Sequence, residues 1–131
     1  MGRSKYSDDE DYYSQDFEKS GVLSIWLGMT DRSLDKDVDT LQDLCGVGYY
    51  ELSEQESNSY NYELVDLKHL FADISYAQSF LDEVVLAARE RNIKKARRVT
   101  VQYNFEYDPT KVTREIAADP IFLGVFSYSL K

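Results

Sequence analysis

The sequence has few of the side chains that carry out most enzyme chemistry. Its 131 residues include a single cysteine, Cys45, and a single histidine, His69. A lone cysteine excludes an internal disulfide and fits a reducing compartment. No stretch approaches the roughly 18 apolar residues of a membrane-spanning helix, and the first twenty residues lack the apolar run of a secretory signal. We therefore expect a cytoplasmic protein.

Positive charge is scarce as well. The chain has 15 Lys and Arg against 24 Asp and Glu, a net charge of −9. Phosphate contacts need clustered Lys and Arg, so we expect neither nucleic acid nor an anionic membrane as a partner. From Asp31 to Glu83, thirteen acids stand against three bases, a local net charge of −10. The basic patch from Arg89 to Arg98 is too small to overturn this. The pattern favours an acidic surface that binds a basic partner.

The length and the composition predict one globular domain. A chain of 131 residues, 43% hydrophobic and 14% aromatic, can build a single core. Residues 1–20 are expected to form a flexible acidic leader, because the run from Asp8 to Asp11 has no apolar periodicity. Tyr12, Tyr13 and Phe17 are the exceptions, and either dock onto the domain or contact a partner. The folded domain is expected to span residues 21–131.

Three segments predict strands. The runs Gly21–Met29 and Ile121–Tyr128 are apolar on both faces, which is typical of buried strands. Val99–Tyr107 alternates apolar and polar residues, which predicts one buried and one solvated face. Tyr49–Leu52 is a candidate short strand, followed by an expected polar loop over residues 53–59.

Two segments predict helices, and a third is ambiguous. Residues 33–45 carry apolar residues at helical spacing, with Ser33 as an N-cap and Gly46 as a stop. Residues 75–91 begin with a capping-box pattern at Ser75, and Asn92 suits a left-handed cap. Residues 62–71 fit a short helix less clearly. We expect an α+β fold in which a mostly antiparallel sheet is packed by two or three helices.

The patterns that suggest metal or catalytic chemistry fail in detail. The spacing Asp35-x-Asp37-x-Asp39 resembles a calcium loop, but the sixth and twelfth places hold Thr40 and Gly46 instead of Gly and Glu. Asp66 and His69 share a helical face, but a metal site there needs further inward carboxylates.

The remaining chemical patterns fail too. Cys45 lies on the apolar stripe at an expected helix end among acids, which raises a thiol pKa and predicts a buried structural thiol. Gly46-Val47-Gly48 lacks the residues of a phosphate-binding loop. Acids alone do not locate a glycosidase pair. We expect no catalytic residue, metal or cofactor.

The acids on the first expected helix, together with the acids and one tyrosine in the segment after it, are the candidate binding residues. Tyrosine is enriched at protein interfaces, and acidic side chains attract a basic partner. Three of the acids fall one turn apart on the expected helix, and the other residues lie in the segment after it. The predicted partner-binding residues are Asp35, Asp39, Asp43, Glu51, Glu54, Glu56 and Tyr60.

Four segments together resemble the immunity protein 22 family of bacterial polymorphic toxin systems. They are Ser24-Ile25-Trp26-Leu27-Gly28, Tyr76-Ala77-Gln78-Ser79-Phe80, Val101-Gln102-Tyr103-Asn104-Phe105-Glu106-Tyr107 and Phe122-Leu123-Gly124-Val125-Phe126-Ser127-Tyr128. The resemblance covers about residues 21–130 and carries no catalytic residue across. It implies a cytoplasmic antitoxin for bacterial competition, such as contact-dependent growth inhibition, that binds and neutralises one cognate toxin domain.

The acidic charge of the chain predicts a basic partner. Nuclease toxins are often basic because they bind phosphates, and an acidic inhibitor gains association rate from the opposite field. We therefore expect occlusion of a basic, nuclease-type toxin domain. The alternative is a small acidic adaptor or regulatory domain that binds a basic peptide or protein. A toxin reading frame directly upstream would favour the first function, and a signalling operon the second.

Overall fold

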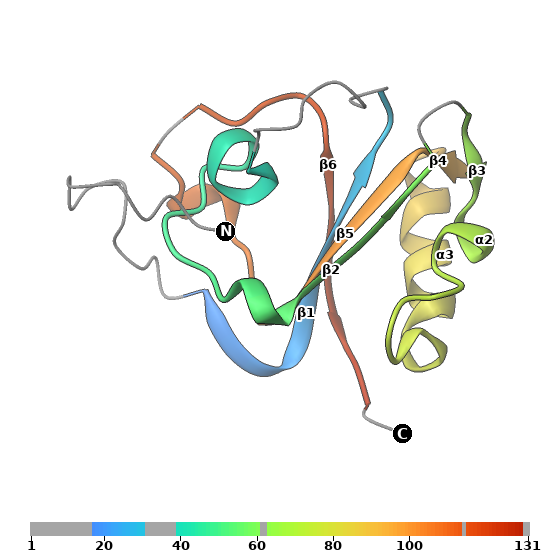
Figure 1. Cartoon of the computed structure of the whole chain (residues 1–131), viewed down its shortest axis with the longest axis horizontal. Helices are drawn as coiled ribbons and strands as arrows, with labels where there is room; N and C mark the ends of the chain where they lie inside the picture. Colours follow the sequence, from blue (N-terminus) through green and yellow to red (C-terminus); the bar gives the residue numbers. More distant parts are fainter. Residues whose placement is uncertain (1–16, 31–38, 61–62, 114, 130–131) are drawn as a thin grey trace.

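The computed structural model describes residues 17–30, 39–60, 63–113 and 115–129. Its centre is a four-stranded antiparallel sheet with the order β2-β5-β1-β6, and a two-stranded ribbon of β3 and β4 lies beside α2 (Figure 1). The strands are β1 (Glu18–Gly28), β2 (Gln55–Ser59), β3 (Val65–Asp66), β4 (Lys95–Ala96), β5 (Arg98–Phe105) and β6 (Ile121–Ser127). The helices are α2 (Leu67–Leu70) and α3 (Leu81–Glu90), with 3-10 turns at Leu52–Glu54, Ala77–Ser79 and Pro109–Lys111 and a π-helical turn at Thr40–Leu44. The expected α+β class is confirmed.

Each face of the sheet carries its own core. On one face, side chains of β1 and β5 pack against Leu67 and Leu70 of α2 and Val84 and Ala88 of α3. On the other face, a mostly aromatic cluster packs against the π-helical turn and the segment after it. Its buried members are Phe17, Trp26, Leu41, Cys45, Val47, Tyr50, Phe105 and Tyr107. Among the described residues, no helix combines the length and the apolar character needed to cross a membrane.

The first strand begins earlier than expected. It starts at Glu18, and Phe17 before it is buried, with its ring 5.4 Å from those of Phe105 and Tyr107. The expected leader boundary at residue 20 therefore falls inside β1. Of the three aromatic residues expected either to dock or to contact a partner, Phe17 docks onto the core. Residues 1–16, with Tyr12 and Tyr13, lie outside the described residues.

A continuous helix over residues 33–45 is wrong. Asp39 is extended, with φ −90° and ψ 111°, so no helix runs through it, and the π-helical turn begins only at Thr40. Residues 31–38, including the expected N-cap Ser33, lie outside the described part of the chain. Gly46 has a φ of +75°, as expected of a stop residue, and a Cβ there would lie 2.3 Å from Val112.

The second helix starts later than its sequence pattern predicts. Tyr76 has a left-handed backbone, with φ 63°, so Ser75 does not form the predicted capping box. A 3-10 turn follows, and α3 begins at Leu81. The predicted left-handed conformation of Asn92, with φ 62°, is confirmed.

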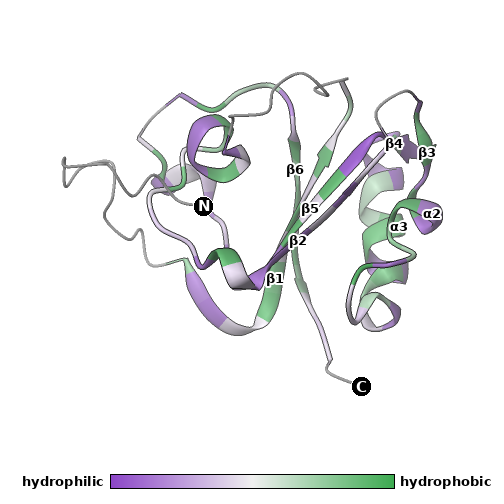
Figure 2. Ribbon diagram, viewed as in Figure 1, coloured by the Kyte–Doolittle hydropathy of each residue, from purple (hydrophilic) through white to green (hydrophobic). Residues whose placement is uncertain are grey.

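In the segment from Tyr49 to Ser59, the strand lies where a loop was expected, and the expected strand is absent. Tyr49–Leu52 is no strand, whereas the expected polar loop contains β2, which is hydrogen-bonded to β5. Figure 2 shows how hydrophilic this strand is beside its apolar neighbours. An edge strand obtains its main-chain hydrogen bonds from the sheet, so it needs little apolar character of its own.

The segment from Val99 to Tyr107 was expected to have one solvated face, and this is wrong at Thr100 and Gln102, whereas Asn104 is half-buried and Glu106 is exposed. Thr100 and Gln102 on that face are buried, because the aromatic core covers it. The Nε2 of Gln102 donates a hydrogen bond to the carbonyl of Glu51 over 2.8 Å, which satisfies a buried amide.

Candidate partner-binding site

Two of the predicted binding residues, Asp39 and Asp43, make hydrogen bonds within the fold. The carboxylate of Asp39 accepts the backbone N–H of Gln42 at 3.0 Å and the hydroxyl of Tyr50 at 2.8 Å. The carboxylate of Asp43 in turn accepts the backbone N–H of Asp39 at 2.8 Å. This reciprocal cap fixes the start of the π-helical turn. The expected helical face of Asp35, Asp39 and Asp43 is therefore wrong at Asp39, and Asp35 lies outside the described residues.

Three other predicted residues lie at one end of the sheet. Glu51 directly precedes the 3-10 turn, Glu54 ends it, and Glu56 lies in β2 opposite Val101 of β5. Tyr60 follows the opposite end of β2, where its backbone N–H donates to the carbonyl of Arg97 and its ring lies 5.0 Å from that of His69. Glu51 and Glu54 line one pocket and Glu54 and Glu56 line a second, whereas Tyr60 lines neither.

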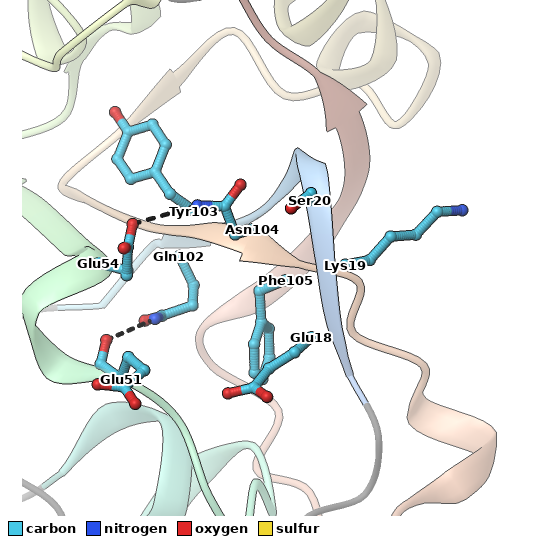
Figure 3. A pocket seen from close by; sticks show the side chains of 9 residues that line it. All are labelled: Glu18, Lys19, Ser20, Glu51, Glu54, Gln102, Tyr103, Asn104 and Phe105. Carbon is cyan, nitrogen blue, oxygen red and sulfur yellow. Dashed lines mark hydrogen bonds between the residues drawn. The ribbon is translucent and has the colours of Figure 1, made fainter.

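The Glu51 pocket lies between β1, β5 and the 3-10 turn and measures about 270 Å³ (Figure 3). Glu18, Glu51 and Glu54 place carboxylates around it. Lys19 is the only basic residue of its lining, and its Nζ points away from the pocket, 3.4 Å from the carboxylate of Glu106. The pocket therefore has an excess of negative charge. Its lining residues are Glu18, Lys19, Ser20, Glu51, Glu54, Gln102, Tyr103, Asn104 and Phe105.

A second cavity, the tyrosine pocket, adjoins the first and measures about 350 Å³. The rings of Tyr103 and Tyr128 have centroids 5.2 Å apart, and the ring of Tyr76 lies 6.1 Å and 5.9 Å from them. The two pockets share the lining residues Glu54, Tyr103 and Asn104, and we call the neighbouring pair the acidic hollow. The tyrosine pocket is lined by Ser53, Glu54, Glu56, Ser75, Tyr76, Tyr103, Asn104 and Tyr128.

The side chains of the tyrosine pocket are held by internal hydrogen bonds. The hydroxyl of Tyr103 donates to the carbonyl of Ser75 at 2.6 Å, and that of Tyr128 donates to Oδ1 of Asn104 at 2.9 Å. The backbone N–H of Gly21 donates to the same Oδ1 at 3.1 Å. Asn104 has a φ of 57° beside the irregular pairing of β1 with β5, a conformation that asparagine tolerates better than most residues.

Burial and neighbouring carboxylates raise the pKa of two of these tyrosines. Burial raises the pKa of Tyr103, and the carboxylate of Glu56 raises it further. Burial also raises the pKa of Tyr128, with a contribution from Glu54. Near pH 7 these residues therefore present ring faces and protonated hydroxyls beside carboxylates. Such a set of groups is suited to binding a cation.

Cys45 is a buried thiol, as predicted. Burial, with smaller contributions from Asp39 and Asp119, raises its pKa to about 12, so almost none of it is thiolate near neutral pH. His69 is exposed on α2. Within the described ranges, no group of three or more His, Cys, Asp or Glu residues is arranged to hold a metal ion.

Sequence reasoning missed the tyrosine pocket. The alternation of residues 99–107 predicts Tyr103 in the core, where it lies, and Tyr76 and Tyr128 fall in the expected helix and strand. Their positions in the sequence give no signal that they meet, because they come from three separate elements. Comparison with known proteins adds no family: no family model, no curated protein and no solved structure matches the chain.

Proposed function

We propose that this protein binds a basic protein partner through the acidic hollow at the end of its sheet. The observation that carries the proposal is the pair of neighbouring pockets, which are lined by Glu18, Glu51, Glu54 and Glu56. The one basic residue of their linings, Lys19, points away from the Glu51 pocket and pairs with Glu106. A concave surface of one sign attracts a partner of the opposite sign and speeds its association.

We further propose that the partner is a bacterial toxin domain that this protein neutralises by occlusion. Support comes from the resemblance of residues 21–130 to the immunity protein 22 family and from the basic character that phosphate-binding nuclease toxins need. An acidic hollow suits both the toxin partner and the basic peptide of an adaptor. The two functions differ in whether binding protects a cell.

Co-expression with the product of the adjacent gene tests the function. We expect a stoichiometric complex on purification and growth of cells that the partner alone would kill. The double variant Glu18→Gln with Glu51→Gln removes two charges from the hollow and should weaken both results. The control, Glu83→Gln with Glu90→Gln, removes two charges from exposed positions on α3 and should leave them unchanged.

The outcomes separate the candidates. A complex without any protection would favour the adaptor. Neither a complex nor protection would contradict the immunity function.

A further inference from the structure

The tyrosine pocket has a composition that its neighbour lacks. Its lining contains the rings of Tyr76, Tyr103 and Tyr128 and the carboxylates of Glu54 and Glu56, and it includes neither lysine nor arginine. An aromatic hollow with uncompensated negative charge is a site for a cation. The ring of Tyr76 is 43% exposed, so the hollow can be reached from solvent.

We propose that the tyrosine pocket receives an arginine side chain of the partner protein. The inference rests on the proposed function, because it names the group by which the basic partner is recognised. The partner's remaining basic residues contact the Glu51 pocket next to it. Arginine at this position is the central anchor of the interface.

The carboxylates are positioned before any ligand arrives. The Oε1 of Glu56 accepts the backbone N–H of Ser75 at 2.8 Å, and the Oε1 of Glu54 lies 3.4 Å from Nδ2 of Asn104. Among the described residues, the Oε2 of each accepts no hydrogen bond from the protein. In each carboxylate, Oε1 therefore contacts the protein, and Oε2 can accept a hydrogen bond from a ligand. Binding to groups that are already fixed loses less conformational entropy.

The aromatic rings favour a guanidinium over an ammonium. Tyr103 packs edge-to-face against Tyr76 and Tyr128, which fixes the three rings, and the ring of Tyr76 is 43% exposed and can present a face to a cation within the ~6 Å range of cation–π attraction. A guanidinium is planar, is more weakly hydrated than an ammonium and carries several N–H donors. It can contact ring faces and carboxylate oxygens at the same time.

Anchors of this kind dominate interface energetics. Tyrosine and arginine are the residue types that alanine scanning finds most often among energetic hot spots, and these cluster in desolvated pockets. A charge-assisted hydrogen bond inside such a pocket is stronger than one at an exposed rim. Loss of the pocket should therefore matter more to the affinity than loss of any rim charge.

A peptide titration tests the pocket without the partner. The probe is acetyl-Gly-Arg-Gly-amide, followed by NMR of the tyrosine rings in the full chain, with the lysine and citrulline peptides as controls. We expect the arginine peptide to shift the ring signals of Tyr76 and Tyr128, the lysine peptide to bind several-fold more weakly, and the neutral citrulline peptide to cause no shift. Equal shifts with the arginine and citrulline peptides would overturn the assignment.

Variants extend the test to the complex. Tyr76→Leu removes the exposed ring, and Glu56→Gln removes the charge but keeps an oxygen for the N–H of Ser75. The matched controls are Leu86→Ala, at an exposed apolar residue of α3, and Glu90→Gln, at the carboxyl end of the same helix. We expect each pocket variant to raise the Kd of the partner complex by about tenfold and each control by less than about twofold. Unfolding by urea verifies that all variants are folded.

The results distinguish this inference from the proposed function. If the partner binds both pocket variants as tightly as it binds the wild type, the arginine anchor is wrong while the binding function stands. If no complex forms with any variant, the binding function fails. The peptide titration still decides the pocket in that case: selective binding of the arginine peptide supports the assignment, and a lack of selectivity overturns it.

Discussion

Asp119 shows how one residue ties separate strands together. Its carboxylate accepts the backbone N–H of Met29 at 2.7 Å, the hydroxyl of Thr30 at 2.9 Å and the guanidinium of Arg98 at 2.6 Å. Burial alone would raise its pKa, but the hydrogen bonds from Met29, Arg98 and Thr30 outweigh burial, and the pKa is lowered. The charged form is therefore favoured in the folded protein. The contacts join the end of β1 to the start of β5.

Replacing Asp119 by asparagine should destabilise the protein by about 3 kcal/mol at pH 7, because the mostly buried guanidinium of Arg98 loses its counter-charge. A lowered folded-state pKa contributes stability that is present above the unfolded value of about 3.9 and is lost as the pH falls through the folded value. The difference in unfolding free energy between the wild type and Asp119→Asn should therefore become smaller below about pH 4. Urea unfolding across the pH range measures it.

The control for Asp119→Asn is Asp73→Asn, at an exposed position, which should leave the free energy of unfolding nearly unchanged. A gap that stays constant from neutral to strongly acidic pH would contradict the assigned role of the charge.

At the scale of elements, a residue beside a strand end can be buried in the core although its sequence neighbours are polar. Phe17 precedes β1 within a polar stretch, yet its ring is only 2% exposed and meets Phe105 edge-on. It closes one side of the aromatic core that also contains Trp26. The polar residues Glu18–Ser20 are strand because Phe17 is anchored and because β5 lies alongside.

Phe17→Ala should therefore cost about 3–5 kcal/mol of unfolding free energy, as expected when a buried phenylalanine is truncated to leave a cavity. Thermal and urea unfolding measure the loss. Leu86→Ala is the matched control, because Leu86 is 58% exposed on α3. An equal effect of the two substitutions would show that Phe17 is not anchored in the core.

At the scale of the whole molecule, the two signs of charge are used differently. The bases after α3 hold the fold: Arg91 donates to the carbonyl of Phe122 at 2.7 Å, Arg97 to that of Met29 at 3.2 Å, and Arg98 to Asp119. The acids of the hollow stand at the other end of β5. The acidic part of the sequence thus places carboxylates around the hollow, whereas part of the basic patch makes hydrogen bonds within the fold.

The association rate with a basic partner should depend on this surface. Glu18→Gln with Glu51→Gln should lower the association rate constant by about threefold to tenfold at low salt and flatten its salt dependence, while the dissociation rate changes little. Stopped-flow or surface-binding kinetics at several ionic strengths measure both. Glu83→Gln with Glu90→Gln is the control of equal charge. If the association rate constants of the two double variants depend on salt in the same way, the interface lies outside the hollow.

Local sequence patterns determined the elements that depend on local physics. Apolar runs and strict alternation located β1, β5 and β6, Asn92 and Gly46 adopted the expected positive φ, and Cys45 was correctly read as a buried thiol. Together these features define the α+β class. They follow from the periodicity, propensity and burial of neighbouring residues.

Only the tertiary structure decided the rest. Asp39 became a cap because Tyr50 and Asp43 lie beside it, and Gln55–Ser59 became a strand because β5 supplies its hydrogen bonds. The tyrosine pocket exists because Glu54, Tyr76, Asn104 and Tyr128 converge from distant parts of the chain. Such contacts depend on strand pairing and side-chain packing over long sequence separations, which no local pattern encodes. The sequence by itself specified how much acid the chain carries, and the fold decided which acids cap its turns and which surround the hollow.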